Sequence, residues 1–155
     1  MYGFNIYTKK ITNLRHEENN INSISHNGVY KIYEDHSGNL WIATDASMFD
    51  YYEKTSEKFY HYPHAYTDQT DILEDHGNKI WIATQNGILS FNTRFKKINS
   101  WQQHADKNSI PGNSVWHMLR SKEGKFIVSS DGLSFFDTAA QAFSSFKIME
   151  NGKNI

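Results

Sequence analysis

The chain has 155 residues, with 16 Lys+Arg against 17 Asp+Glu and a formal net charge of −1. This balance gives no electrostatic reason to expect nucleic acid or an anionic membrane surface as a partner. The chain has no cysteine, so it has neither a disulfide framework nor a thiolate metal site. No apolar run approaches the roughly 20 residues of a transmembrane helix, so we expect no membrane contact by this segment.

In chain order, the first predicted elements are two short strands at 3–7 and 11–14, joined by the polar turn 8–10. Isoleucine, phenylalanine, tyrosine and threonine in these runs favour strand over helix. The polar stretch 15–27 follows, and we expect it to be a linker.

The next segment, 32–44, ends in Trp-Ile-Ala-Thr and recurs 40 residues later at 72–84. In each copy an aspartate, Asp35 or Asp75, stands six residues before the tryptophan. Apolar runs of a few residues, broken by Gly, Asn and Ser turns, indicate strands joined by hairpins.

A third copy at 118–130 keeps the apolar pattern, but Ser121 replaces the aspartate and Ile127 replaces the tryptophan. Each copy continues with a turn, an aromatic strand, a polar turn and a Phe-x-x-apolar segment, the last at 59–62, 95–98 and 143–146. Four short strands in a repeat of about 40–45 residues are typical of a propeller blade.

The predicted fold class is therefore all-β, a β-propeller fragment of about three and a half four-stranded antiparallel blades in an incomplete ring. Residues 1–155 form one propeller segment in this interpretation. Its parts are an outer half-blade at 1–14, blades at 27–62 and 69–101, and a degenerate blade at 113–146.

Propellers typically close with about four to eight blades, so this count leaves two apolar blade faces open to water. Large exposed apolar patches mark association sites. The expected partners are the remaining propeller blades of a longer protein, or a second copy of this chain through the open blade faces.

Both clear copies resemble the two-component-regulator propeller repeat. The resemblance is carried by Glu-Asp-x-x-Gly-Asn-Leu-Trp-Ile-Ala-Thr at 34–44, and by Glu-Asp through Trp-Ile-Ala-Thr at 74–84 with the turn Asn-Gly-Ile at 86–88. The stretches 22–27 and 108–113, which both begin Asn-Ser-Ile, resemble the family's linker into the innermost strand.

The resemblance implies an extracytoplasmic, periplasmic sensor of a hybrid two-component histidine kinase of the Bacteroides type, with oligosaccharides as ligands. Sensors of that family have two propellers of about seven blades each, followed by a β-sandwich, a membrane span and kinase domains. Residues 1–10 have no apolar core of a signal peptide, and the chain has no kinase motif.

Two other patterns were weighed as chemistry. Asp35 and Asp75, each preceded by a glutamate, resemble the paired acids of glycosidases. Their fixed offset before a tight turn instead favours hydrogen bonds to the turn's own backbone N–H groups. The pair His61 and His64 lacks a third metal ligand, so we expect no metal and no cofactor.

Most aromatic side chains are expected to pack rather than to bind a ligand. Trp41 and Trp81 lie within the second strand of their repeats and are predicted to pack between blades. The same structural role is predicted for the aromatic residues of the outer strands: Tyr51, Tyr52, Phe59, Phe91, Phe95, Phe135, Phe136 and Phe143.

The predicted ligand site lies on the loops of one face of the ring, because binding residues concentrate on such loops. One set of loops joins the last strand of a blade to the first strand of the next, and the other joins the second strand to the third. The candidates are polar loop residues, possible stacking groups, and innermost-strand residues that share one offset toward the axial channel. They are Asp45, Gln85, Asn86 and Asp131, then Tyr66 and Trp116, then Lys31, Asp71 and His117.

The sequence thus favours a sensor with a glycan ligand and no catalysis of its own. A protein-interaction scaffold is the alternative, because propeller loop faces also recognise peptides. A propeller lyase is the third hypothesis, although no separated acid and base emerge from the sequence.

Overall fold

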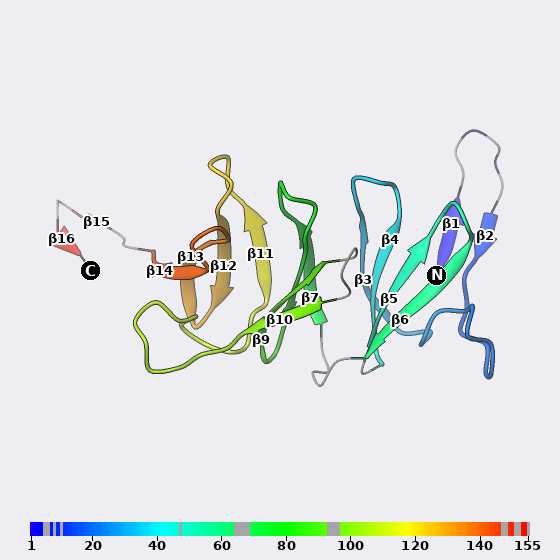
Figure 1. Cartoon of the computed structure of the whole chain (residues 1–155), viewed down its shortest axis with the longest axis horizontal. Coiled ribbons are helices and arrows are strands. Elements are labelled where there is room, and N and C mark those ends of the chain that lie inside the picture. The colour runs from blue at the N-terminus through cyan, green and yellow to red at the C-terminus, as the bar shows by residue number, and fades with distance from the viewer. Residues whose placement is uncertain are drawn as a thin grey trace. The chain divides into compact units, whose positions relative to one another are not determined.

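The computed structural model describes residues 1–4, 7, 9, 11–46, 48–63, 69–92, 97–146, 149–150 and 153–154. Within these residues every regular element is a β-strand and no helix occurs. Three four-stranded antiparallel sheets and two two-stranded sheets form, each from strands consecutive in sequence (Figure 1). The all-β prediction is confirmed.

The chain divides into two compact units, Met1–Gln69 and Thr70–Ile155. The first unit holds the two-stranded sheet of β1 (Tyr2–Phe4) and β2 (Ile11–Asn13). It also holds a four-stranded sheet, here called blade 1, made of β3 (Val29–Glu34), β4 (Leu40–Thr44), β5 (Met48–Glu53) and β6 (Lys58–Pro63).

The strands of the second unit form blade 2, blade 3 and a short hairpin. Blade 2 consists of β7 (Gln69–Glu74), β8 (Ile80–Thr84), β9 (Gly87–Asn92) and β10 (Lys97–Trp101). Blade 3 consists of β11 (His117–Arg120), β12 (Phe126–Ser130), β13 (Gly132–Asp137) and β14 (Ala142–Ser145). The hairpin of β15 (Met149–Glu150) and β16 (Lys153–Asn154) was not predicted from the sequence.

The first hairpin of each blade closes with the same turn. Gly38, Asn78 and Gly124 occupy its fourth position with φ of 80°, 60° and 83°. Glycine adopts positive φ without strain and asparagine tolerates it, so these residues allow the chain to reverse there. The turns expected at 36–39 and 76–79 are thereby confirmed.

The geometry that these turns share explains why an aspartate recurs before two of them. Asp35 Oδ1 accepts the backbone N–H groups of Ser37 and Asn39 at 3.0 and 2.9 Å. Asp75 Oδ1 accepts those of Gly77 and Lys79 at 2.8 and 3.0 Å. The predicted structural role of the aspartates is confirmed, and these carboxylates are engaged by their own turns.

The core of the first unit lies between β1–β2 and blade 1. Ile24, Ile42 and Phe59 are buried there, and Met1 and Leu14 pack against them. Burial of such side chains is the main favourable term in folding. The linker that contains Ile24 is thus part of the core and not a loose connection.

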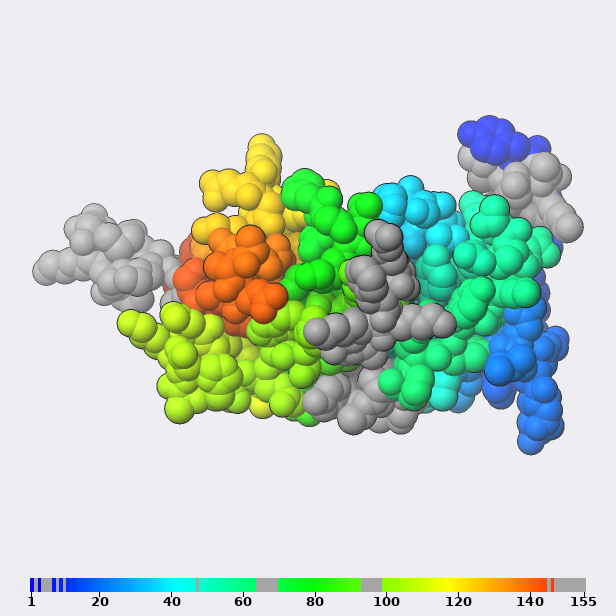
Figure 2. Space-filling model, viewed as in Figure 1, coloured from blue at the N-terminus to red at the C-terminus, as the bar shows by residue number. Residues whose placement is uncertain are grey.

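The core of the second unit lies between blades 2 and 3. The ring of Trp81, on β8, lies 5.6 Å from that of Phe126 on β12 and 5.2 Å from that of Phe136 on β13, in edge-to-face contacts. The same cluster includes Ile110 and Val115 from the chain between the two blades. The prediction that Trp81 packs between blades is confirmed. Figure 2 shows residues 102–113 (yellow-green) at the surface of this unit, beside the orange β13–β14 hairpin.

The aromatic residues of blade 1 also cluster. The Trp41 ring lies 4.8 Å from that of Tyr51 and 5.7 Å from that of Phe49, and Tyr62 stacks on Phe49 at 5.2 Å. Burial, with a smaller contribution from the Asp35 carboxylate, raises the pKa of Tyr51 to about 12. The cluster therefore favours the neutral phenol.

Candidate ligand-binding loops

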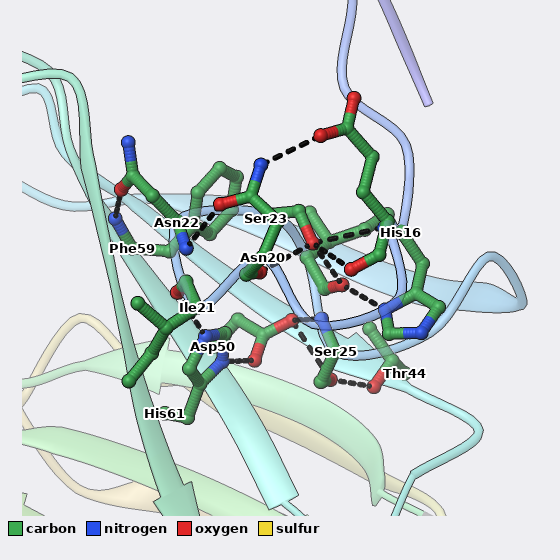
Figure 3. A network of polar contacts seen from close by, with 12 residues as sticks. His16, Asn20, Ile21, Asn22, Ser23, Ser25, Thr44, Asp50, Phe59 and His61 are labelled. Atoms are coloured by element: carbon green, nitrogen blue, oxygen red, sulfur yellow. Dashed lines mark hydrogen bonds and ion pairs between the residues drawn. The ribbon is translucent and has the colours of Figure 1, made fainter.

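In the first unit the linker 15–27 is fixed to blade 1 by a polar network centred on Asp50 (Figure 3). Asp50 lies on β5 and is fully buried. Its Oδ2 accepts the backbone N–H and the hydroxyl of Ser25 at 2.8 and 2.9 Å. The Ser25 hydroxyl also lies 2.8 Å from that of Thr44 at the end of β4. A buried carboxylate is tolerated here because its oxygens are hydrogen-bonded.

His61, opposite Asp50 on β6, completes the network. Its Nδ1 lies 2.7 Å from Asp50 Oδ1, and its Nε2 lies 2.8 Å from the carbonyl oxygen of Ile21. A carbonyl oxygen only accepts, so Nε2 is the donor to Ile21. The contact between Nδ1 and the Asp50 carboxylate is within hydrogen-bond distance. The ring is occupied on both sides by protein groups.

Hydrogen bonds within the linker fix the rest of its path. The Ser23 hydroxyl donates to the Asn20 carbonyl at 2.9 Å and accepts the backbone N–H of Glu17 at 3.0 Å. Asn22 Oδ1 accepts the backbone N–H of Phe59 on β6 at 2.8 Å. These bonds hold the linker in one conformation against the blade, which favours a preorganised surface.

A cavity of about 200 Å³ opens beside this network. It lies between the linker and the β5–β6 hairpin, and most of its exposed lining surface is apolar. The lining residues are His16, Asn20, Ser23, Ile24, Ser25, Met48 and His61.

In the second unit the linker 102–113 is held by a different set of hydrogen bonds. Asn113 accepts the backbone N–H of Gly87 through its carbonyl at 2.7 Å and that of Gln103 through Oδ1 at 2.6 Å. Gln102 Nε2 donates to the carbonyl of Asn86 at 3.4 Å. Asn86, one of the predicted site residues, is thus joined to the linker by its backbone, while its neighbour Gln85 is exposed.

Two other predicted residues hold equivalent positions in blades 1 and 3. The backbone N–H of Asp45 donates to the Gly28 carbonyl at 2.9 Å, and a Cβ on Gly28 would lie 3.2 Å from that of Asp45. A Cβ on Gly112 would overlap the carboxylate of Asp131. Both aspartates are exposed and stand against a glycine of the neighbouring linker.

The three innermost-strand candidates lie in different environments. Asp71 is 4% exposed, and its Oδ2 accepts the backbone N–H of Met118 on β11 at 3.0 Å. His117 is largely exposed, with Nδ1 3.9 Å from Asp71 Oδ2. Lys31 is half-buried in the first unit. The structure therefore brings Asp71 and His117 together and makes Asp71 a link between two blades.

Of the two predicted stacking groups, Trp116 is 51% exposed just before β11. Tyr66 lies outside the described residues, as does His64 of the histidine pair and Phe95 of the outer strands. Among the residues that the structure describes, no group of three histidine, aspartate or glutamate side chains is arranged to hold a metal ion.

Sequence reasoning missed Ser25 and Asp50, and it considered His61 only as a metal ligand. A signal for Asp50 was present, because a charged residue in the aromatic run Met-Phe-Asp-Tyr-Tyr must be paired if it is buried. Its partners come from 25 residues before and 11 residues after it, so they follow only from the strand pairing.

The comparisons with known proteins concern the fold and one repeat of the chain. Residues 23–46, from the linker through β3 and β4, match the family model of the two component regulator propeller. This part of the chain is similar to a two-component regulator propeller repeat. No match is found among curated proteins.

Solved structures with the propeller fold are similar over most of the chain. An extracellular domain assigned to the hybrid two component system BT3049 of B. thetaiotaomicron matches 91% of this chain with a TM-score of 0.76 at 19% identity. Virginiamycin B lyase from Staphylococcus aureus matches 81% with a TM-score of 0.61 at 14% identity. At these identities the likeness shows the propeller fold. The chain spans 20% of the BT3049 domain and 43% of the lyase.

In the described part of the chain, no helix has the length and apolarity needed to cross a membrane.

Proposed function

We propose that this chain is a ligand-sensing propeller segment of an extracytoplasmic, periplasmic receptor in a two-component system, that it binds oligosaccharides, and that it has no catalysis of its own. The match of residues 23–46 to the two component regulator propeller carries this proposal. The fold of an extracellular domain of such a system, shared over most of the chain, supports it.

The ligand is proposed to bind at the loop face of a unit: the linker 15–27 and the β4–β5 turn in the first, or the linker 102–113 and the β8–β9 and β12–β13 turns in the second. Exposed polar side chains at the turns provide donors and acceptors, and Trp116 offers a half-exposed aromatic face for a sugar ring. The candidates are Asp45 and Lys31 in the first unit and Gln85, Asn86, Asp131, His117 and Trp116 in the second. Tyr66 stays a candidate from the sequence and lies outside the described residues. Asp71 is retained as a candidate that would act from within the blade 2–blade 3 link.

Thermal unfolding in the presence of an oligosaccharide panel tests this proposal. The experiment uses the longest polypeptide encoded in frame with residues 1–155, because the candidate loop residues come from several blades. A ligand that binds only the folded protein raises its melting temperature by mass action. Trp116→Ala should reduce the shift, whereas Ile11→Ala, a change at an exposed apolar residue of β2, serves as the control.

Three outcomes separate the alternatives. A melting-temperature shift that Trp116→Ala diminishes supports the sensor. Capture of a specific peptide at the loop face, with no response to any glycan, would replace the sensor by an interaction scaffold. Release of unsaturated products from a polysaccharide would make the chain a lyase, the activity named for one structure of similar fold.

We also propose that the exposed face of blade 3 is covered by another propeller blade. Leu119, Ile127 and Phe135 stand opposite one another on three adjacent strands, and Leu119 is 64% exposed. The other face of the same sheet packs on Trp81 of blade 2, so blade-on-blade contact is the mode this sheet already uses. Light scattering on the 155-residue chain tells whether a second copy supplies the cover: a dimer that Leu119→Asp dissociates would show it.

A further inference from the structure

Two cavities lie at the same position in their blades. The first, of about 200 Å³, lies between the linker 15–27 and β5–β6. The second, of about 220 Å³, lies between the linker 102–113 and β13–β14. Strand pairing fixes the correspondence, since Asp50 is opposite His61 in blade 1 and Ser134 is opposite Ser145 in blade 3.

In blade 1 this position holds a carboxylate. Asp50 receives two hydrogen bonds from Ser25 and one contact from His61, as described above. In blade 3 both central partners differ. Ser134 replaces Asp50, and Pro111, which has no N–H, replaces Ser25 in the shared Ser-Ile-x sequence of the linker. The carboxylate is therefore lost together with a group that bound it.

The loss leaves a polar group without a partner. Ser134 is fully buried, and its hydroxyl makes no hydrogen bond with any described residue. Leaving a buried hydroxyl unpaired is unfavourable, and such groups are usually matched by water or a ligand. Ser134 is also among the residues that line the second cavity.

The rest of the lining is mainly polar and carries one cation, Lys107, and one anion, Asp106. Gln103, Lys107, Ser109 and Ser144 contribute to it. Lys107 is exposed, and no ion pair to it occurs among the residues that the structure describes. Asp106 also lines the cavity, but its Oδ1 accepts the backbone N–H of Asn108 at 2.8 Å.

We propose that the cavity of blade 3 binds a small molecule through a carboxylate group, in the place that the Asp50 carboxylate occupies in blade 1. The Ser134 hydroxyl donates to the bound carboxylate, and Lys107 balances its charge at the rim. The carboxylate can belong to a simple organic acid or to an acidic sugar. The site stands on its own residues and does not depend on the sensor function.

Binding to the 155-residue chain is measured by amide chemical shifts and by thermal unfolding. Acetate and D-glucuronate are the acidic probes, and acetamide and D-glucose are their neutral counterparts at equal ionic strength. Both acids should shift the amides of Ser134, Ser109 and Lys107, and neither neutral probe should. Tighter binding of glucuronate identifies an acidic sugar as the better occupant, and binding of acetate alone identifies a small organic acid.

Three variants decide the role of Ser134. Ser134→Ala should weaken binding of the acids about tenfold or more, because a hydrogen bond to a charged group is lost. Ser134→Asp supplies its own carboxylate and should abolish the response to acetate. Ser90→Ala is the matched control, since Ser90 also has a buried hydroxyl without a partner but does not line this cavity. Equal responses to acetate and acetamide, or acetate binding unchanged by Ser134→Ala, would overturn the proposal.

Discussion

The carboxylate of Asp75 and the indole of Trp81 are joined by a hydrogen bond of 2.8 Å between Oδ2 and Nε1. Asp35 and Trp41 repeat the bond at 3.1 Å. Both indoles are fully buried, and a buried N–H needs an acceptor. Since the other oxygen of each aspartate receives the turn's N–H groups, one carboxylate satisfies both the hairpin and the tryptophan.

The third repeat shows that these two residues form one structural unit. Ser121 still accepts the backbone N–H of Lys125 through its hydroxyl at 3.2 Å, so the turn is retained. Ile127, in place of the tryptophan, has no N–H to satisfy. The degenerate copy has thus lost the donor and its acceptor together, and neither is left unpaired.

A double-mutant cycle on Asp75 and Trp81 tests this coupling. Asp75→Ser should lower the free energy of unfolding by about 1–3 kcal/mol, because the buried indole N–H loses its acceptor. Trp81→Ile costs packing on Phe126 and Phe136 as well. The double variant, which reproduces the third repeat, should cost less than the sum of the single variants by about 1–2 kcal/mol. Denaturant unfolding followed by circular dichroism measures all four proteins.

The control is Asp35→Ser, whose partner Trp41 lies in the other unit of the chain. In the double variant of Asp35→Ser and Trp81→Ile, the loss in free energy of unfolding should equal the sum of the losses in the two single variants, because the two sites share no hydrogen bond. Additivity of the Asp75 and Trp81 changes would contradict the coupling.

The strands and turns could be predicted because their causes are local. Apolar runs of four to six residues, and glycine or asparagine at the fourth turn position, determine the hairpins without any tertiary information. The repeat offset also gave the role of Asp35 and Asp75 in their turns. The hydrogen bond from the indole N–H to the aspartate was not predicted, because it depends on the orientation of the tryptophan side chain across the hairpin.

The environment of the site residues could not be predicted by alignment of repeats. Lys31, Asp71 and His117 share an offset, yet they are half-buried, buried and exposed. An irregular register between Val29 and Lys31 distinguishes blade 1. Asp50 has no acidic counterpart in the other blades, where Leu89 pairs with Ile82 and Ser134 with Val128. Long-range pairing, and not the repeat, decides these contacts.

Asp71 should contribute to the stability of the second unit. Its carboxylate accepts the N–H of Met118 at 3.0 Å, and Thr70 donates to Val115 beside it. Asp71→Ala leaves the buried Met118 N–H unpaired and should cost about 1–3 kcal/mol. Hydrogen exchange should show faster exchange at Met118. His117→Ala, at an exposed partner of the same carboxylate, should change little, and an equal effect of the two substitutions would refute the assigned role.

Two turn glycines provide a matched steric test. Gly87 and Gly132 have φ of 101° and 111°, so alanine is strained at both. A Cβ at Gly132 would meet nothing within 4 Å, whereas one at Gly87 would overlap the Trp101 carbonyl. Gly132→Ala should therefore cost about 1–2 kcal/mol from the backbone alone, and Gly87→Ala distinctly more. Equal melting temperatures of the two variants would show that the overlap is relieved without cost.

The aromatic cluster of blade 1 should respond to alkaline pH. The pKa of Tyr51 is about 12 in the folded chain, mainly through burial, against about 10 for an exposed tyrosine. An acid with a raised pKa stabilises the folded state fully below its unfolded pKa, and this contribution is lost as pH rises through the folded value. The chain should therefore lose stability between about pH 10 and pH 12. Tyr51→Phe should flatten this part of the curve in unfolding experiments, and phenolate absorbance should show one late-titrating tyrosine fewer. Tyr60→Phe, at a neighbouring ring that is 36% exposed, is the comparison, and an identical alkaline loss in the Tyr51→Phe protein would rule the group out.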